Sequence, residues 1–213
     1  MEFLLIALAL LLPSVLGISL VNLLLPAGVP ARIPVVAGYG ILLGLVLVPL
    51  LMRFLNLVGA GAGFPVTAAL CVLLTALAVF FHVRRGQADV PAPAANGAVF
   101  ANLSRPEQAL YLLFAVLLVS HVILPAVELM GRPLYPFDAT MHWATKARVW
   151  FEQGELVPFV DNTAWLKMGG DGVYTDHHAV YPVTTPLLQV WMTSAIGRWD
   201  ESVMNLPWVR IWP

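Results

Sequence analysis

Residues 3–25 read FLLIALALLLPSVLGISLVNLLL, a run without a single charged side chain. A membrane-spanning helix needs roughly 20 predominantly apolar residues to cross about 30 Å of hydrocarbon. Three later runs also meet this requirement, at residues 34–51, 64–81 and 109–130. Short segments rich in Gly, Ala and Pro separate the first three runs and read as turns. The sequence therefore predicts four helices that cross a lipid bilayer.

A fifth apolar run, residues 183–196, is shorter than the other four. Thr185 is the expected N-cap with Pro186 in the first helical position, and Gly197 is the expected end of the helix. Residues 179–182 extend this run toward the headgroup region, so we expect it to be a span as well. The predicted fold is an all-α integral membrane protein with about five transmembrane helices.

The amino-acid composition supports the same class. Hydrophobic residues make up 60% of the 213-residue chain and charged residues only 11%. A soluble domain carries about 25% charged residues, so this chain has too few charges to cover a water-exposed surface. The net charge of −1 argues against a nucleic-acid partner, which needs a basic face. The single cysteine, Cys71, excludes an intrachain disulfide and a multi-cysteine metal site.

The chain divides into three parts. Residues 1–83 hold the three N-terminal transmembrane helices. Residues 84–108 form a linker rich in Ala, Pro, Gly and Asn, without helical or alternating periodicity. Residues 109–213 contain a transmembrane helix, a polar loop at residues 131–182 and the last apolar run.

Basic residues beside the spans predict the orientation. Cytoplasmic loops collect Lys and Arg, and placing the linker in the cytoplasm puts four arginines there and leaves only Arg53 outside among the early loops. The four are Arg32, Arg84, Arg85 and Arg105. We therefore expect a multi-pass protein of the plasma (inner) membrane, with the N-terminus and the loop 131–182 on the extracytoplasmic side.

Polar residues concentrate in the loop 131–182, which holds six of the twelve acids and three of the five histidines. A helical pattern covers residues 139–153 and ends at Gly154. Its apolar and aromatic stripe consists of Trp143, Ala147 and Trp150. Asp138, His142, Thr145, Arg148 and Glu152 lie on a different face. The spacing predicts an amphipathic surface helix with its polar face toward a wet cavity.

Asp138 stands where a Pro-rich segment after the fourth span turns into this surface helix. One interpretation is an N-cap, in which the carboxylate accepts N–H bonds from the first helical turn. The other is a functional carboxylate that takes a proton or holds a cation at the mouth of a membrane cavity. The two roles are compatible, because a capping residue can also face a substrate.

A glycine-rich turn at residues 169–172 leads to Asp176, His177 and His178. These three side chains could bind a divalent cation together with another loop acid. Adjacent histidines on an extended segment point to opposite sides, so they seldom bind one ion. A solvated loop or a wall that contacts substrate is the favoured interpretation, and the divalent cation stays the alternative.

The segment 135–148, YPFDATMHWATKAR, resembles the first extracytoplasmic loop of GT-C fold glycosyltransferases. These multi-span enzymes are related to protein O-mannosyltransferases and to the aminoarabinose and Rgt-type lipopolysaccharide-core sugar transferases. The order of elements is similar too, with YPVTTPLLQ at residues 181–189 opening the next helix and WDES at 199–202 following it. The resemblance covers roughly residues 109–208.

The resemblance implies a hexosyltransferase of the cell envelope that moves a sugar from a polyprenyl-phosphate donor to a glycan, lipid or protein acceptor. Asp138 matches the family's loop aspartate, which acts as general base or positions the acceptor hydroxyl. Arg132 and nearby cations would stabilise the departing phosphate, and aromatic rings, Trp165 among them, would stack on the sugar. The expected substrate-binding residues are His142, Trp143, Lys146, Arg148, Tyr174 and His178.

The chain departs from the family pattern in two respects. Many members have a second acid directly after the aspartate, where this chain has Ala139. The family also continues through further spans that complete the donor site, so we expect either a fragment, inactive by itself, or a second membrane chain that completes the fold. The rival interpretations are a non-catalytic accessory subunit or transporter component, and a metal-dependent hydrolase that uses Asp176, His177 and His178.

Overall fold

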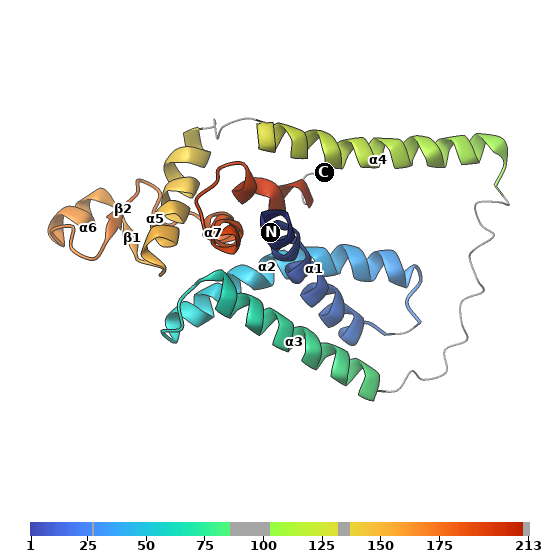
Figure 1. The fold of residues 1–213 in the computed structure, drawn as a ribbon, viewed down its shortest axis with the longest axis horizontal. Coiled ribbons are helices and arrows are strands. Elements are labelled where there is room, and N and C mark those ends of the chain that lie inside the picture. The colour runs from blue at the N-terminus through green and yellow to red at the C-terminus, as the bar shows by residue number, and fades with distance from the viewer. Residues whose placement is uncertain (27, 86–102, 132–136, 211–213) are drawn as a thin grey trace.

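The computed structural model describes residues 1–26, 28–85, 103–131 and 137–210 (Figure 1). Most of the predicted linker and the Pro-rich segment before Phe137, with Arg132, lie outside the described residues. The helices and strands, in chain order, are α1 (Glu2–Leu24), α2 (Arg32–Leu57), α3 (Phe64–Arg84), α4 (Arg105–Gly131), η2 (Ala139–Ala144), α5 (Thr145–Gln153), β1 (Phe159–Val160), α6 (Asn162–Lys167), β2 (Tyr174–Thr175), α7 (Thr184–Ile196) and η3 (Val203–Arg210).

Four helices, α1 to α4, are long and apolar enough to cross a membrane, and they lie within a few residues of the predicted spans. Large apolar side chains such as Phe54, Val72 and Leu118 are exposed along them. On a soluble protein such a surface is an aggregation hazard, whereas lipid covers it at no cost. The all-α fold is confirmed, and the four long apolar helices support a multi-pass membrane protein.

The fifth span is a wrong prediction. Helix α7 has 13 residues, which at 1.5 Å per residue gives about 20 Å, short of the hydrocarbon thickness. It starts at Thr184 after Val183, one residue before the predicted cap, although it ends at Gly197 in the left-handed conformation as expected. Helix α7 is apolar because protein rather than lipid surrounds it, and nine of its residues are buried.

Glycines bring α1 and α2 into close contact. A Cβ atom on Gly17 would collide with the carbonyl oxygen of Gly40, and one on Gly44 would collide with the carbonyl oxygen of Pro13. Gly40 and Gly44 are four residues apart and so share one face of α2. Such small-xxx-small spacing lets helix backbones approach closely in a membrane, where burial of apolar surface gives no driving force.

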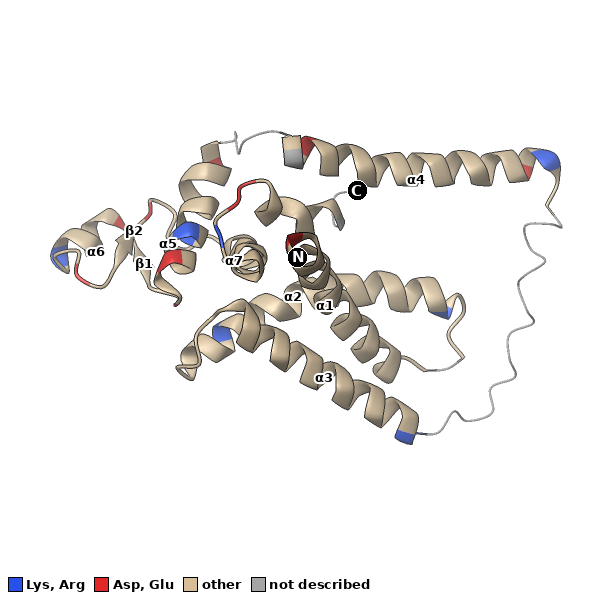
Figure 2. Cartoon of the chain, in the orientation of Figure 1, with Lys and Arg blue, Asp and Glu red and all other residues tan. Residues whose placement is uncertain are grey.

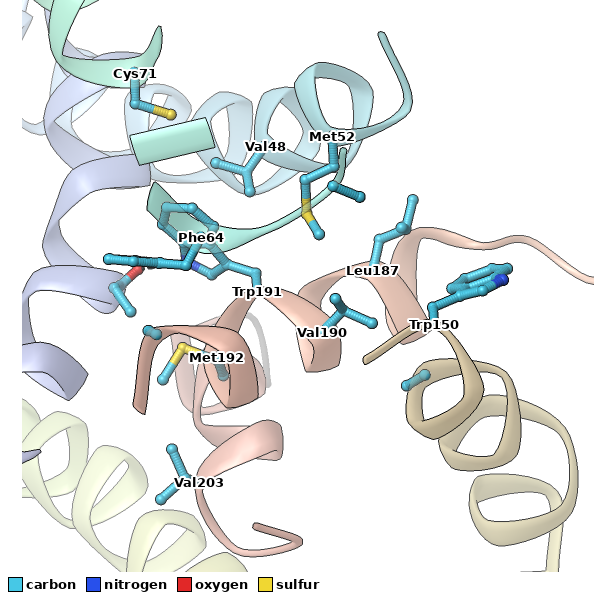
Figure 3. Close-up of a cluster of buried hydrophobic side chains, with 14 of the residues drawn as sticks. Val48, Met52, Phe64, Cys71, Trp150, Leu187, Val190, Trp191, Met192 and Val203 are labelled. Carbon is cyan, nitrogen blue, oxygen red and sulfur yellow. Dashed lines mark hydrogen bonds between the residues drawn. The ribbon is translucent and has the colours of Figure 1, made fainter. Parts of the chain in front are cut away.

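Helix α7 packs across the ends of α1, α2 and α3, seen end-on in the middle of Figure 1. Its Trp191 is the centre of the core (Figure 3): the indole ring lies 4.5 Å from the ring of Phe64, and its N–H donates to the carbonyl of Ala9 at 2.8 Å. Val48 and Met52 of α2 complete this cluster from the other side. The last apolar element therefore joins the polar loop to the three-helix bundle.

Helix α4 is different, because none of its most apolar 18-residue window is buried. Within the described residues it packs mainly on η3, and it runs alone along one edge of the molecule in Figure 1. Its Arg105 end lies on the same side as the start of α2 and the end of α3, whereas its Gly131 end lies toward the loop (Figures 1 and 2). The four spans therefore present four arginines at one end and the polar loop at the other.

Candidate functional site

The candidate site begins where α4 ends and the surface helix starts. The predicted helix is present from Ala139 to Gln153, and Gly154 ends it with φ of 71°. Its first turn, η2, is π-helical rather than α-helical. Single π-helical turns are rare and occur often at functional sites. The sequence pattern predicted the helix and did not reveal this turn.

Asp138 directly precedes the π-helical turn and its side chain is exposed. The carboxylate makes no capping hydrogen bond, and the residue itself has helical backbone angles (φ −62°, ψ −35°). The N-cap interpretation is therefore wrong, because a capping residue takes extended angles and accepts an N–H bond. The other interpretation, a functional carboxylate, remains, because the Asp138 side chain is exposed.

A buried ionic cluster fixes the surface helix to the end of the loop. His142 Nδ1 lies 2.6 Å from Asp176 Oδ1, and Lys146 Nζ lies 2.7 Å from Asp176 Oδ2. The three residues retain 6%, 7% and 1% of their accessible surface (His142, Asp176 and Lys146). Oδ2 has no well-aligned hydrogen bond, so its contact with the ammonium is an ion pair. Hereafter we call these three residues the ionic cluster.

The backbone of His178 completes the cluster. Its N–H donates to Asp176 Oδ1 at 3.0 Å, and its carbonyl accepts from Lys146 Nζ at 2.9 Å. Burial raises the pKa of Asp176, but the ion pair with Lys146 and the hydrogen bonds from the His178 N–H and His142 outweigh it and bring the pKa below its ordinary value. The carboxylate is therefore ionised at neutral pH, as the neighbouring ammonium requires.

Aromatic rings enclose the histidine of the cluster. The rings of His178 and Tyr181 stack at 4.4 Å with 6° between their planes, and each meets the ring of His142 edge-on. Phe137, next to Asp138, approaches the His142 ring at 6.1 Å from the other direction. His142 thus joins the start of the surface helix to the segment that leads into α7.

The predicted polar face of the helix is only partly correct. Thr145, Arg148 and Glu152 are exposed, with Arg148 paired to Glu152 at 2.9 Å. His142, expected on the same face, is buried. The predicted apolar stripe is confirmed at Ala147 and Trp150, which are buried, while Trp143 is half-buried.

The expected substrate-binding residues divide into two groups. His142 and Lys146 are buried in the ionic cluster, and His178 contacts it, although the His178 side chain is exposed. Arg148 and Tyr174 are exposed, and the Tyr174 hydroxyl receives a hydrogen bond from Gln153 at 3.2 Å. The structure therefore brings His142, Lys146 and His178 together. It leaves Arg148 and Tyr174 exposed on the surface.

The alternative metal site does not form in the part of the chain that the structure describes, where no three His, Cys, Asp or Glu side chains converge. The Asp176 carboxylate is already paired with Lys146 and His142, and His177 is exposed. The glycine-rich turn before them is present, since Gly169, Gly170 and Gly172 all have positive φ. It connects α6 to β2, which pairs in parallel with β1.

Sequence reasoning missed the partnership of Lys146 and Asp176. A signal for it exists: Lys146 follows Trp143 by three residues and precedes Trp150 by four, so helical spacing puts it on the buried stripe. A lysine in that position needs an acid. Which of the six loop acids supplies it depends on the fold of residues 154–176, which periodicity does not reveal.

The fold and site thus define a multi-pass membrane protein with a polar loop held together by buried charges. Comparison with protein-family models, with curated proteins and with solved structures finds no match for this chain.

Proposed function

We propose that this chain is a membrane glycosyltransferase of the GT-C type, or the N-terminal portion of one, with Asp138 as its general base. The observation that carries the proposal is the exposed Asp138 carboxylate, at the start of the surface helix and directly before its π-helical turn. The resemblance of residues 135–148 to the first extracytoplasmic loop of GT-C enzymes adds the reaction class. The polar loop is extracytoplasmic in this proposal, where polyprenyl-phosphate sugars serve as donors.

The proposed reaction is substitution at the anomeric carbon of the donor. An acceptor hydroxyl attacks this carbon, the bond from the carbon to the phosphate oxygen breaks, and polyprenyl phosphate leaves with the electron pair. The hydroxyl proton passes to the Asp138 carboxylate, which supplies the usual contribution of a positioned base. The exposed start of the helix gives both substrates access to this carboxylate.

The departing phosphate needs cationic partners. Lys146 is buried, so in the described part of the helix Arg148, which is exposed and forms a surface pair with Glu152, is the cation that a donor reaches. Tyr174 and the half-buried Trp143 are the aromatic surfaces for the sugar ring in this proposal. The ionic cluster has a supporting role, since it holds the helix that carries Asp138.

The test is transfer of label from undecaprenyl-phosphate-linked [14C]glucose, mannose and galactose, assayed in membranes of cells that make the protein and of cells from which its gene is deleted. We expect one donor to lose label to an acceptor, with release of undecaprenyl phosphate, in the first membranes only. Equal transfer in both, with all three donors, would favour the accessory-subunit interpretation instead.

A further inference from the structure

A cavity of about 300 Å³ lies at the opposite end of the bundle from the loop, between the last turns of α1 and α3. It is lined by Leu23, Leu24, Phe81, Arg84 and Arg85. In Figure 2 this is the end at which α2 starts, α3 ends and α4 starts with arginines. The proposed glycosyl transfer makes no use of this region.

Hydrogen bonds hold the wall of the cavity in place. Arg85 donates to the carbonyl of Leu23 at 2.8 Å, and Arg32 donates to the carbonyls of Asn22 and Leu25 at 3.0 and 3.1 Å. These carbonyls lie in the last turn of α1 or, for Leu25, directly after it, where no intrahelical donor is available. The Arg85 guanidinium is therefore fixed at the rim by the helix end.

In the described part of the chain, no acid balances the charge at the rim. Within the described residues no carboxylate pairs with Arg84 or Arg85. The Arg84 guanidinium lies over the Phe80 ring at 4.9 Å from its centroid, a contact that leaves its N–H donors free for another partner. Helix dipoles offset only about half a charge at each C-terminus. The rim therefore attracts an anion.

The other wall of the cavity is apolar. Leu24 and Phe81 are exposed there, at 70% and 54%, next to helices that lipid surrounds. A free phosphate ion would satisfy the arginines and leave these side chains in water. A phospholipid satisfies both, because its phosphate meets the guanidinium groups while its acyl chain covers the apolar wall.

We infer that this cavity binds the phosphate headgroup of an anionic phospholipid, in the leaflet that contacts the arginine-bearing end of the spans. The inference rests on the cavity, on the two guanidinium groups that no carboxylate of the described residues neutralises, and on the apolar wall. It stands independently of the proposed glycosyltransferase activity. Its chemistry is a phosphodiester held by Arg84 and Arg85, with the last turns of α1 and α3 as the platform.

The test is native mass spectrometry of lipid retained by the purified protein, after exchange into mixed phosphatidylglycerol and phosphatidylcholine. The wild type is expected to retain phosphatidylglycerol preferentially. R84Q is expected to reduce this preference about fivefold, the effect of one basic residue near an anionic lipid surface, and R84Q/R85Q to abolish it. Arg53→Gln is the matched control, because Arg53 lies at the other end of the spans, and it should keep the full preference.

R84Q is the single substitution least expected to disturb the fold, since within the described residues Arg84 only lies over the Phe80 ring, whereas Arg85 donates a hydrogen bond to the Leu23 carbonyl. Unchanged phosphatidylglycerol retention in R84Q/R85Q, or an equal loss in R53Q, would overturn the inference. Displacement of the lipid by excess inorganic phosphate would also overturn it, because the cavity would then be a site for the free ion.

Discussion

Asp176→Asn is expected to destabilise the polar loop by about 3–5 kcal/mol, the usual cost of removing one partner from a buried ion pair. The substitution keeps the shape of the side chain but leaves the Lys146 ammonium, 1% exposed, without its counter-charge. The bond of His142 Nδ1 to Asp176 weakens at the same time. The measurement is thermal unfolding of the purified protein in detergent, combined with limited proteolysis of residues 154–182.

Two further variants sharpen this prediction. Asp171→Asn is the matched control, because Asp171 is an exposed acid of the same loop, and it should change stability by less than about 0.5 kcal/mol. Adding Lys146→Met to Asp176→Asn should recover part of the lost stability, since both buried charges are then gone. If Asp176→Asn were as stable as Asp171→Asn, the ionic cluster would not be what holds the loop.

Asp138→Asn is expected to reduce sugar transfer by at least about 100-fold, the lower range of a general base's contribution. Abundance, membrane insertion and thermal stability should stay near wild type, because the carboxylate is exposed and makes no capping bond. Glu155→Gln, which neutralises another exposed acid of the loop, is the control and should transfer at the normal rate. The measurement is the labelled-donor assay in native membranes, with the protein quantified by blotting.

Opposite outcomes separate the two roles of Asp138. Full transfer in Asp138→Asn would remove the base from the proposed mechanism. A loss of stability as large as that of Asp176→Asn would mean that Asp138 supports the helix after all. A selective loss of transfer in a stable protein is the expected pattern.

The long spans could be predicted from the sequence because twenty apolar residues have one stable environment, a helix across the bilayer. Helix α7 could not be predicted in the same way. A run such as residues 183–196 is apolar whether lipid or protein covers it, and its contact with Ala9 and Phe64 joins positions more than a hundred residues apart. Length was the available clue, and it indicated a buried helix rather than a span.

The candidate site also divides into parts that local sequence predicts and parts that depend on tertiary contacts. Asp138 and the surface helix could be placed from local pattern, since a cap-like acid, helical spacing and Gly154 lie within a few turns of each other. The pairing of Lys146 with Asp176 could not, because it depends on the tertiary position of a loop thirty residues away. The π-helical turn leaves no signal in the apolar periodicity. The close contact of α1 and α2 does have a sequence signal, because Gly40 and Gly44 are four residues apart.

Cysteine labelling determines on which side of the membrane residues 131–182 lie. Cys71 is completely buried, so a membrane-impermeant maleimide reacts with introduced thiols only. One thiol is introduced in the loop as Val180→Cys, at a residue that is 94% exposed, and the other in the linker as Ala94→Cys. Because the loop is proposed to be extracytoplasmic, we expect Val180→Cys to be labelled in intact cells and Ala94→Cys only after permeabilisation. Labelling of Ala94→Cys in intact cells, with Val180→Cys protected, would contradict it.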